Sequence, residues 1–461
     1  MWIPTVLDTN KPRYVALSDT IAQAIESGIL TAGEKLPTHR WLADRLGVTV
    51  GTVSRAYQEA ERLGLVQAKV GSGTFVYQAK DNADGFSMLD TSELAEHLVD
   101  MSVNLPVPAE QHGLQLALRD IADRLPTLNL LGYQPEQGAH HQRMWAQNWL
   151  ATKQLPVDLP RITITMGGQH CLMLSLMAIA KAGDIIASEG VTYPGIAAIA
   201  MQLGIKIMGL PMDMEGVLPD AFESACKQNK LRALYLTPQV QNPTNASMGL
   251  QRRRDLIAVA KHHHVMIIED TVSESYIDDL SISFAALAPE QCFTAVSHSK
   301  HLAGGLRVGY LIAPATFADR LGQAVRAQCW STSALLVEAT QRWINTQDYR
   351  RMEVDNLQEL AYRRAFVANK LCTFSVVVNP QSSHVWLPLE EPWRAQDLQQ
   401  NLLVQGIKVL TGDAFSVGRF VAPQAIRFCI GAVRSRTFFE QAVDEIAQQL
   451  LCQAKPRLTV F

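Results

Sequence analysis

The chain has 461 residues, of which 48% are hydrophobic and 18% are charged, and its formal net charge is -3 at pH 7. This length and composition predict a soluble protein with more than one domain. The small net charge excludes a global electrostatic field for nucleic acid or an anionic membrane, so any contact with DNA has to be local. The seven cysteines show no CxxC spacing and fit neither a disulfide framework nor a zinc site, so we expect reduced thiols.

We find no segment that would direct the chain to a membrane. The clean apolar runs, such as Cys171 to Ala180, stop well short of the roughly 18 to 20 residues that span a bilayer. Residues 1–14 lack a basic segment that leads into an apolar one, so we expect no secretory signal. These observations predict a cytoplasmic protein without membrane contact.

The first 78 residues predict a small helical module that ends in a β-hairpin. Thr38 and Thr49 are suitable helix N-caps, and Gly47 is a suitable helix end. A Gly-Ser-Gly turn separates two short strand-like runs that follow. The predicted elements are helices over residues 14–27, 38–46 and 49–63 and strands over residues 65–70 and 74–77. Three helices and a hairpin in this order predict a winged helix-turn-helix.

A helix-turn-helix reads DNA by placing its second motif helix in the major groove. Hydroxyls at helix starts reach phosphates, and guanidinium groups reach phosphates or guanine edges. The candidate DNA contacts are Arg40, Thr49, Thr52 and Arg55 in the helices and Gly71, Ser72 and Gly73 in the wing. Residues 1–78 hold eight basic and seven acidic residues, so one copy should bind DNA weakly. On pattern alone, a scaffold or a protein-contact module is the alternative.

The rest of the chain divides into a linker and a second domain. Residues 79–101 are polar, with neither strong periodicity nor a long apolar run, which is typical of a linker. Over residues 102–461, buried-looking strand runs alternate with helical stretches, which predicts a parallel α/β architecture. We expect a large subdomain over about residues 155–320 and a smaller α+β subdomain from the flanking segments.

Lys300 is the most informative residue of the second domain. A lone lysine is usually a solvated surface charge. Lys300, however, lies in an apolar context, with hydroxyls at Ser297 and Ser299 before it and Arg307 after it. This arrangement suits an amine that must be desolvated and a phosphate that must be held nearby. Pyridoxal phosphate needs both.

Three further segments offer what this cofactor demands, and each has an ordinary structural alternative. Asp270 ends a hydrophobic strand and could pair with a protonated ring nitrogen or cap a helix. Gly167-Gly168-Gln169 precedes an apolar helix that could bind phosphate, although a lone glycine pair is weak evidence. Asn242 could donate to the cofactor 3′ oxygen or merely form a turn. The consecutive histidines 262–264 cannot converge on one ion, so we expect no metal site.

Both parts of the chain resemble known families. The segment GILTAGEKLPTHRWLADRLGVTVGTVSRAYQEAERLGLVQAKVGSGTFV resembles the GntR-type winged helix, including its terminal GSGTFV. Residues 102–461 resemble the fold type I, aspartate aminotransferase-like superfamily of α/β proteins. The matching features are, in chain order, the glycine loop, Tyr193-Pro-Gly, Asn242-Pro, Asp270, Lys300 and Arg307. Together the two parts resemble the MocR (GabR-like) regulators over the full length.

The second resemblance implies a role for each candidate around the cofactor. Lys300 would form the aldimine with pyridoxal phosphate, and Asp270 would pair with the pyridine nitrogen. Asn242 would meet the 3′ oxygen, and Tyr193 would stack on the ring. The implied phosphate ligands are Ser297, Ser299, Arg307 and the N–H groups of Gly168 and Gln169.

Two more residues take their roles from the same resemblance. Arg427 matches the arginine that grips the α-carboxylate of the ligand, a task for a bidentate guanidinium. Without the family, a surface salt bridge is the alternative for this residue. Tyr133 matches a tyrosine that reaches the cofactor phosphate of a neighbouring subunit, which implies a homodimer.

The sequence departs from the family pattern at two places. The family usually has a tyrosine two or three residues after the aspartate, where its phenol also bonds the 3′ oxygen. This chain has Val272 and Ser273 there, and the nearest tyrosine is Tyr276. Asn245 replaces the glycine common after Asn-Pro-Thr. We expect cofactor binding to survive and efficient transamination to be less assured.

The full resemblance implies a pyridoxal phosphate-dependent transcriptional regulator that binds double-stranded DNA as a homodimer. It would sense an amine or amino acid through the Lys300 aldimine. The rival hypothesis is an active aminotransferase with an accessory DNA-binding domain, and limited transaminase activity fits either.

Overall fold

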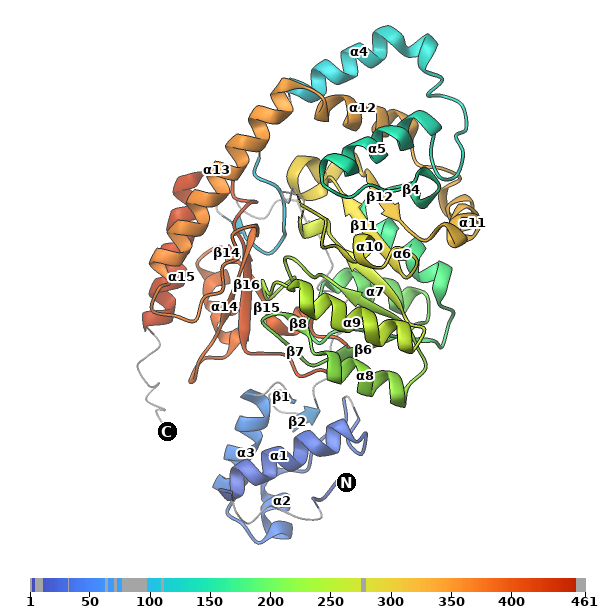
Figure 1. Ribbon diagram of the computed structural model, residues 1–461. Coiled ribbons are helices and arrows are strands. Elements are labelled where there is room, and N and C mark those ends of the chain that lie inside the picture. The colour runs from blue at the N-terminus through green and yellow to red at the C-terminus, as the bar shows by residue number, and fades with distance from the viewer. Residues whose placement is uncertain are drawn as a thin grey trace.

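The computed structural model describes residues 2–4, 11–31, 33–62, 65–69, 73–76, 98–108, 112–274 and 279–452. An N-terminal module lies below a larger domain, which consists of a large subdomain and a small subdomain (Figure 1). Within the described ranges, no helix combines the length and the apolar character needed to cross a membrane.

The N-terminal module is the predicted winged helix-turn-helix. Its elements are α1 (Arg13–Glu26), α2 (His39–Leu46), α3 (Val50–Arg62) and the antiparallel hairpin of β1 (Val66–Lys69) and β2 (Gly73–Val76). Gly47 ends α2 with a positive φ of 61°, and the Thr49 hydroxyl caps α3 by accepting from the Thr52 N–H at 3.1 Å. Thr38 stands at the N-cap of α2, but its side chain makes no capping bond. The predicted wing residues Gly71 and Ser72 lie outside the described residues.

The large subdomain contains a seven-stranded sheet in the order β4-β12-β11-β10-β9-β5-β6, in which β12 alone runs opposite to the others. The strands are β4 (Ile162–Thr165), β5 (Ile185–Glu189), β6 (Lys206–Leu210), β9 (Leu231–Leu236), β10 (Met266–Asp270), β11 (Cys292–Ser297) and β12 (Gly309–Ile312), with a separate hairpin of β7 (Met212–Asp213) and β8 (Gly216–Val217). The predicted parallel α/β architecture is therefore correct, with one antiparallel strand.

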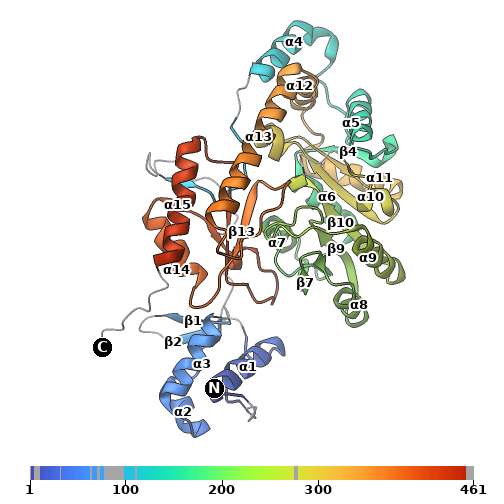
Figure 2. The same ribbon diagram turned by 60° about the vertical axis from the view of Figure 1, so that its left-hand side comes forward.

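Helices cover both faces of this sheet, which explains why its strands are continuous apolar runs. One face packs against α6 (Gly168–Ile179), α7 (Pro194–Gln202) and α11 (Ala318–Cys329). The other packs against α8 (Pro219–Gln228), α9 (Leu250–His262) and α10 (Phe284–Leu287). The α5 helix (His140–Thr152) lies near β4, with Ala146 and Leu150 in a further apolar core. The carboxyl ends of the parallel strands open toward the small subdomain (Figure 2).

The small subdomain is an α+β unit built around a three-stranded sheet in the order β13-β16-β15. Its elements are α13 (Gln347–Lys370), β13 (His384–Pro388), α14 (Ala395–Val404), β14 (Ile407–Lys408), β15 (Leu410–Thr411), β16 (Ala425–Cys429) and α15 (Arg436–Cys452). Two more helices, α4 (His112–Leu128) and α12 (Ala334–Ile344), lie side by side at the far end of the molecule from the N-terminal module (Figure 1).

The predicted linker extends too far toward the C-terminus. Val99–Asp100 form strand β3, which pairs in parallel with β14 of the small subdomain. Met101 is fully buried in the core of that subdomain. Such a strand of two residues is too short to produce a detectable alternation in a polar segment, and its partner strand is 308 residues further along the chain, because Val99 pairs with Ile407. We name residues 98–108 the strap.

Candidate functional site

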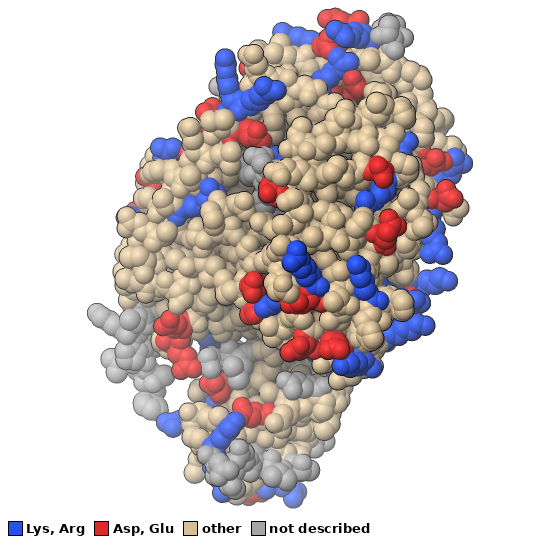
Figure 3. Space-filling view, viewed as in Figure 1, with Lys and Arg blue, Asp and Glu red and all other residues tan. Residues whose placement is uncertain are grey.

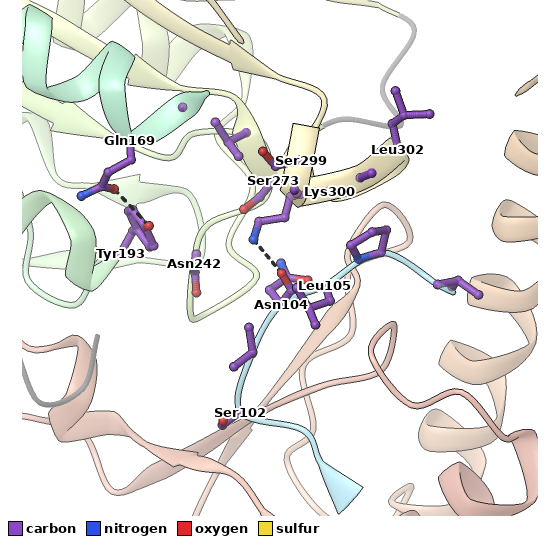
Figure 4. A pocket seen from close by; sticks show the side chains of 18 of the residues that line it. Ser102, Asn104, Leu105, Gln169, Tyr193, Asn242, Ser273, Ser299, Lys300 and Leu302 are labelled. Carbon is purple, nitrogen blue, oxygen red and sulfur yellow. Dashed lines mark hydrogen bonds between the residues drawn. The ribbon is translucent and has the colours of Figure 1, made fainter. Parts of the chain in front are cut away.

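A cavity of about 1410 Å³ lies where the sheet of the large subdomain meets the small subdomain and the strap. Figure 4 shows its centre, with Lys300 on one side and Asn104 of the strap on the other. Side chains from several strand ends and loops converge here, as expected at the carboxyl edge of an open α/β sheet. No three His, Cys, Asp or Glu side chains in the described ranges are grouped so that they could hold a metal ion.

Lys300 stands in a π-helical turn, Ser299–Ala303, directly after β11. Its Nζ donates a hydrogen bond to the backbone carbonyl of Asn104 at 2.6 Å. Burial lowers the pKa of Lys300 from 10.5 to about 8, because the charged ammonium loses its hydration. A substantial fraction of this amine is therefore neutral near pH 8 and can attack a carbonyl carbon.

Strand alternation separates the roles of the two acids that end β10. Asp270 faces the cavity, whereas Glu269 faces the opposite side of the sheet and pairs with the buried Arg253 at 3.1 Å. Asp270 is 5% exposed, and its two oxygens accept from the Val272 N–H at 2.9 Å and the Tyr235 hydroxyl at 2.7 Å. Its carboxylate is placed to accept a hydrogen bond from an N–H or O–H group of a ligand in the cavity.

One corner of the cavity is suited to an anionic group. Gly167, with a positive φ of 86°, turns the chain from β4 into α6, whose first residues, Gly168 and Gln169, line the cavity. A Cβ on Gly168 would lie 2.4 Å from the Val272 side chain, so the close approach requires glycine. Arg307 reaches over this turn and donates to the Met166 carbonyl at 3.0 Å. Free N–H groups at a helix start and a guanidinium are the usual phosphate ligands.

The two predicted serine ligands take different positions. Ser299 lines the cavity beside Lys300 (Figure 4). Ser297 lies behind it, 2% exposed, with its hydroxyl 2.8 Å from the Ser299 hydroxyl and donating to the Val308 carbonyl. Ser297 therefore supports Ser299 and does not itself face the cavity.

Tyr193 and Asn242 complete the walls around the expected ring position. The Tyr193 hydroxyl donates to Gln169 Oε1 at 3.1 Å, which holds the phenol ring against the cavity (Figure 4). Asn242 uses its Oδ1 to accept from Arg427 at 3.2 Å. Its amide nitrogen is therefore the group that is left to donate into the cavity.

Arg427 extends from β16 into the cavity and is only 4% exposed. Besides Asn242 it donates to the backbone carbonyl of Ser102, and its guanidinium lies 4.8 Å from the centroid of the Phe415 ring. Its Nε is buried without a hydrogen-bond partner among the described residues. A buried guanidinium with an unsatisfied donor is suited to a carboxylate ligand.

Of the two departures from the family pattern, the structure explains the asparagine at position 245. It places no tyrosine at the two positions that follow Thr271. Asn245 has a positive φ of 63°, which asparagine tolerates better than most residues, so the backbone keeps the shape that glycine usually provides. Its amide donates to the Val377 and His384 carbonyls at 3.1 and 3.0 Å, joining the Asn242 loop to the small subdomain. Val272 and Ser273 line the cavity, and Tyr276 lies outside the described residues.

The predicted DNA contacts lie on the outer surface of the module. Arg40, Thr49 and Arg55 are exposed and Thr52 is half-buried, and the two threonine hydroxyls are 2.9 Å apart. Basic and acidic side chains are interspersed over the face shown in Figure 3. This face therefore carries no large field of one sign that would attract DNA over a long range.

Tyr133 lies away from the cavity of its own chain. Its side chain is 85% exposed, and its ring lies 5.3 Å from that of Trp330. The structure therefore does not bring Tyr133 to the cavity of this chain.

The sequence reasoning missed three groups at the site. The Tyr235 hydroxyl and the backbone carbonyls of Ser102 and Asn104 contact Asp270, Arg427 and Lys300, respectively. Tyr235 is part of an apolar strand run, and backbone carbonyls leave no mark in a sequence, so neither gave a signal.

Comparison with known proteins agrees with this geometry. Residues 96–446 match the model of aminotransferase class I and II, and residues 13–76 match that of the bacterial regulatory proteins of the gntR family. An uncharacterized HTH-type transcriptional regulator of Bacillus subtilis, YdeF, is 28% identical over 96% of this chain and 95% of its own length. The pyridoxine biosynthesis regulator PdxR of Corynebacterium glutamicum is 29% identical over 78% of this chain and 82% of its own.

Among solved structures, an archaeal alanine:glyoxylate aminotransferase superposes with a TM-score of 0.72 at 20% identity, covering 86% of this chain and 99% of that one. The fold and the cavity thus define a fold type I aminotransferase domain joined to a winged helix-turn-helix. The chain belongs to the aminotransferase class I and II family, and its N-terminal module is of the gntR type.

Proposed function

We propose that this protein is a pyridoxal phosphate-dependent transcriptional regulator that binds double-stranded DNA and senses an amino acid at Lys300. The observation that carries the proposal is that one chain combines a winged helix-turn-helix with a cavity suited to pyridoxal phosphate. The cavity holds a lysine amine with a lowered pKa, a buried carboxylate, and a helix start and an arginine that could bind phosphate. The regulator YdeF, which is similar over 96% of this chain, and the regulator PdxR, which is similar over 78% of it, support the proposal.

The residues of the cavity fit this cofactor. Gly168, Gln169, Ser299 and Arg307 would hold its phosphate, Asp270 its ring nitrogen and Asn242 its 3′ oxygen. When bound, pyridoxal phosphate supplies an aldehyde that bonds reversibly to primary amines. Lys300 would hold that aldehyde covalently until an incoming amine displaces it.

The cavity favours an amino acid over a simple amine as effector. Arg427 is buried with an unsatisfied Nε, and an α-carboxylate would satisfy it. Among the described lining residues there are five basic side chains, Lys300, Arg307, Lys408, Arg427 and Arg434, against the single acid Asp270. Since Asp270 is committed to the cofactor ring, an effector with a cationic side chain would have no counter-charge.

The strap offers a physical connection between the cavity and the DNA-reading module. Lys300 and Arg427 both bond to its backbone carbonyls, at Asn104 and Ser102. The hydrogen bond from Lys300 would be lost when Lys300 bonds to the cofactor. The hydrogen bond from Arg427 would be rearranged when Arg427 binds a carboxylate. The chain that precedes the strap leads to the module, which also contacts the small subdomain directly through Arg394 and Glu61 at 3.1 Å.

We further propose that the active form is a homodimer. The exposed Tyr133 and Trp330 would lie in the interface, with Tyr133 near the cavity of the partner subunit. A single module with a net charge of +1 should bind DNA weakly. Two modules in a dimer would share the entropic cost of binding DNA and so bind more tightly.

The proposal is tested by measuring how amino acids change DNA affinity. Duplexes selected from a random library by the cofactor-loaded chain are titrated with that chain, with and without each amino acid and a set of simple amines. We expect at least one amino acid to change the affinity by about 5-fold to 150-fold, a typical allosteric coupling. The Arg427→Gln chain should bind DNA unchanged and lose the response. Absence of DNA binding, or sustained transamination without DNA, would contradict the proposal.

The candidate DNA residues predict a separate effect. Arg40→Ala or Arg55→Ala should weaken DNA binding by about 1 to 3 kcal/mol if the side chain contacts a base, or lower the salt dependence by about one ion if it contacts a phosphate. Binding is measured by fluorescence anisotropy at several salt concentrations. Arg350→Ala, an exposed arginine on α13, is the matched control. Unchanged binding in both Arg40→Ala and Arg55→Ala would exclude these contacts.

The lowered pKa of Lys300 predicts the pH dependence of cofactor attachment. Only the neutral amine attacks an aldehyde, and burial places its pKa at about 8. The rate at which the cofactor-free chain reacts with pyridoxal phosphate should therefore rise about tenfold per pH unit below pH 8 and level off above it. Stopped-flow absorbance measures this rate. A rate that keeps rising to pH 10, as for a solvated lysine, would show that the amine is not desolvated.

A further inference from the structure

Tyr235 is a buried phenol that touches the cavity only through Asp270. It lies on β9, next to β10, and the register places it opposite Ile268, so its side chain and that of Asp270 are on the same face of the sheet. Tyr235 is 0% exposed, and its hydroxyl donates to Asp270 Oδ2 at 2.7 Å. Tyr235 does not line the cavity itself.

The ionised form of Asp270 needs a hydrogen-bond donor such as the Tyr235 hydroxyl, because the carboxylate is buried and has lost most of its hydration. Burial raises the pKa of Asp270, and the nearby Glu269 raises it further. The Val272 N–H and the Tyr235 hydroxyl act in the opposite direction, since each donates to one carboxylate oxygen. A neutral carboxyl would not stabilise a protonated pyridine nitrogen, so the ionisation of Asp270 decides whether the ring can be held as a cation.

The phenol is suited to act as a permanent donor. Burial raises the pKa of Tyr235 well above 10, so the hydroxyl keeps its proton at any physiological pH. The thiol of Cys171, also buried near Asp270, has its pKa raised to about 12 and adds no negative charge. Each carboxylate oxygen has a second lone pair, so Asp270 can accept from Tyr235 and from a ring N–H at the same time.

We propose that Tyr235 is a positioning residue that keeps Asp270 ionised and oriented toward the ring nitrogen of pyridoxal phosphate. This inference rests on the proposed function, because it assigns a role toward the same cofactor. The chain lacks a tyrosine two or three residues after Asp270, where the phenol would contact the 3′ oxygen. It has one instead on the neighbouring strand β9, hydrogen-bonded to the carboxylate that would hold the ring nitrogen.

The test compares two ligands on the full-length, cofactor-free chain and its Tyr235→Phe variant. One ligand is pyridoxal phosphate, and the other is its analogue with a C–H in place of the ring nitrogen. A hydrogen bond to a charged group contributes about 1.5 to 3 kcal/mol, so Tyr235→Phe should raise the Kd for pyridoxal phosphate about tenfold or more. The Kd for the analogue, which makes no demand on the charge of Asp270, should change less than twofold.

Two further measurements make the test specific. Tyr349→Phe, which removes another buried phenol whose hydroxyl donates to Glu353 at 2.8 Å, should leave both Kd values unchanged. With saturating ¹⁵N-labelled pyridoxal phosphate, the nitrogen chemical shift should report a protonated ring in the natural chain and partial loss of that proton in Tyr235→Phe.

The outcomes separate the inference from the function on which it rests. If Tyr235→Phe weakens the binding of both ligands equally, Tyr235 has a merely structural role and the inference is wrong. The same holds if the pyridine ring of pyridoxal phosphate stays fully protonated in this variant. If the natural chain binds neither ligand, the proposed function itself fails.

Discussion

Replacing Lys300 by alanine is expected to abolish covalent attachment of the cofactor. The natural chain mixed with pyridoxal phosphate should become yellow, and reduction with borohydride should fix the cofactor on Lys300, as read by peptide mass analysis. In the Lys300→Ala chain both signals should be lost. Lys300 reaches the centre of the cavity, and burial lowers its pKa to about 8, so it is the lysine prepared to react.

A second lysine of the same cavity provides the control. Lys408 also lines the cavity, but it is half-exposed and forms an ion pair with the Asp100 carboxylate at 3.6 Å. Lys408→Ala should therefore keep the yellow colour and the reduced adduct. If Lys300→Ala retained the same absorbance and adduct, the assignment of Lys300 would be wrong. The Lys300→Ala chain should still bind DNA, because the substitution is far from the exposed face of the N-terminal module.

Replacing Arg253 by methionine is expected to destabilise the large subdomain by about 3 to 5 kcal/mol, the usual cost of leaving one partner of a buried ion pair uncompensated. Arg253 is 1% exposed and Glu269 is 0% exposed, and they lie 3.1 Å apart. Glu269 also accepts from the Phe284 N–H at 2.9 Å and the Thr294 hydroxyl at 2.8 Å, so it connects α9, α10 and β11 beneath Asp270. Urea unfolding followed by tryptophan fluorescence measures the effect.

The neighbouring arginine and a double variant complete this test. Arg254 is exposed on the same helix, so Arg254→Met should change stability by less than about 0.5 kcal/mol. Replacing both Arg253 and Glu269 by methionine should recover part of the lost stability, because no buried charge remains unpaired. A single Arg253→Met variant as stable as the natural chain would show that the pair contributes little to the fold.

The residue pattern was sufficient to predict the two-part organisation of the chain and the residue types of the site. Gly47 ends α2 and Thr49 caps α3 within a few residues of each other, so spacing was enough to predict the helix-turn-helix. Lys300, Asp270 and Arg307 were identifiable because their local contexts were unusual for charged residues and because the chain resembles a known family. Their types and order were predictable without coordinates.

The contacts that support these residues became visible only in the folded domain. β3 was missed because its partner strand is 308 residues further along the chain. The contacts from Ser102 and Asn104 come from backbone carbonyls, which no residue type reveals. Ser297 and Ser299 look equivalent in sequence, yet the turn after β11 points only Ser299 into the cavity. Tyr235 looks like any apolar strand residue until β9 and β10 are placed side by side. Each of these contacts depends on pairing between distant segments, which is set by the packing of the whole domain rather than by local preference.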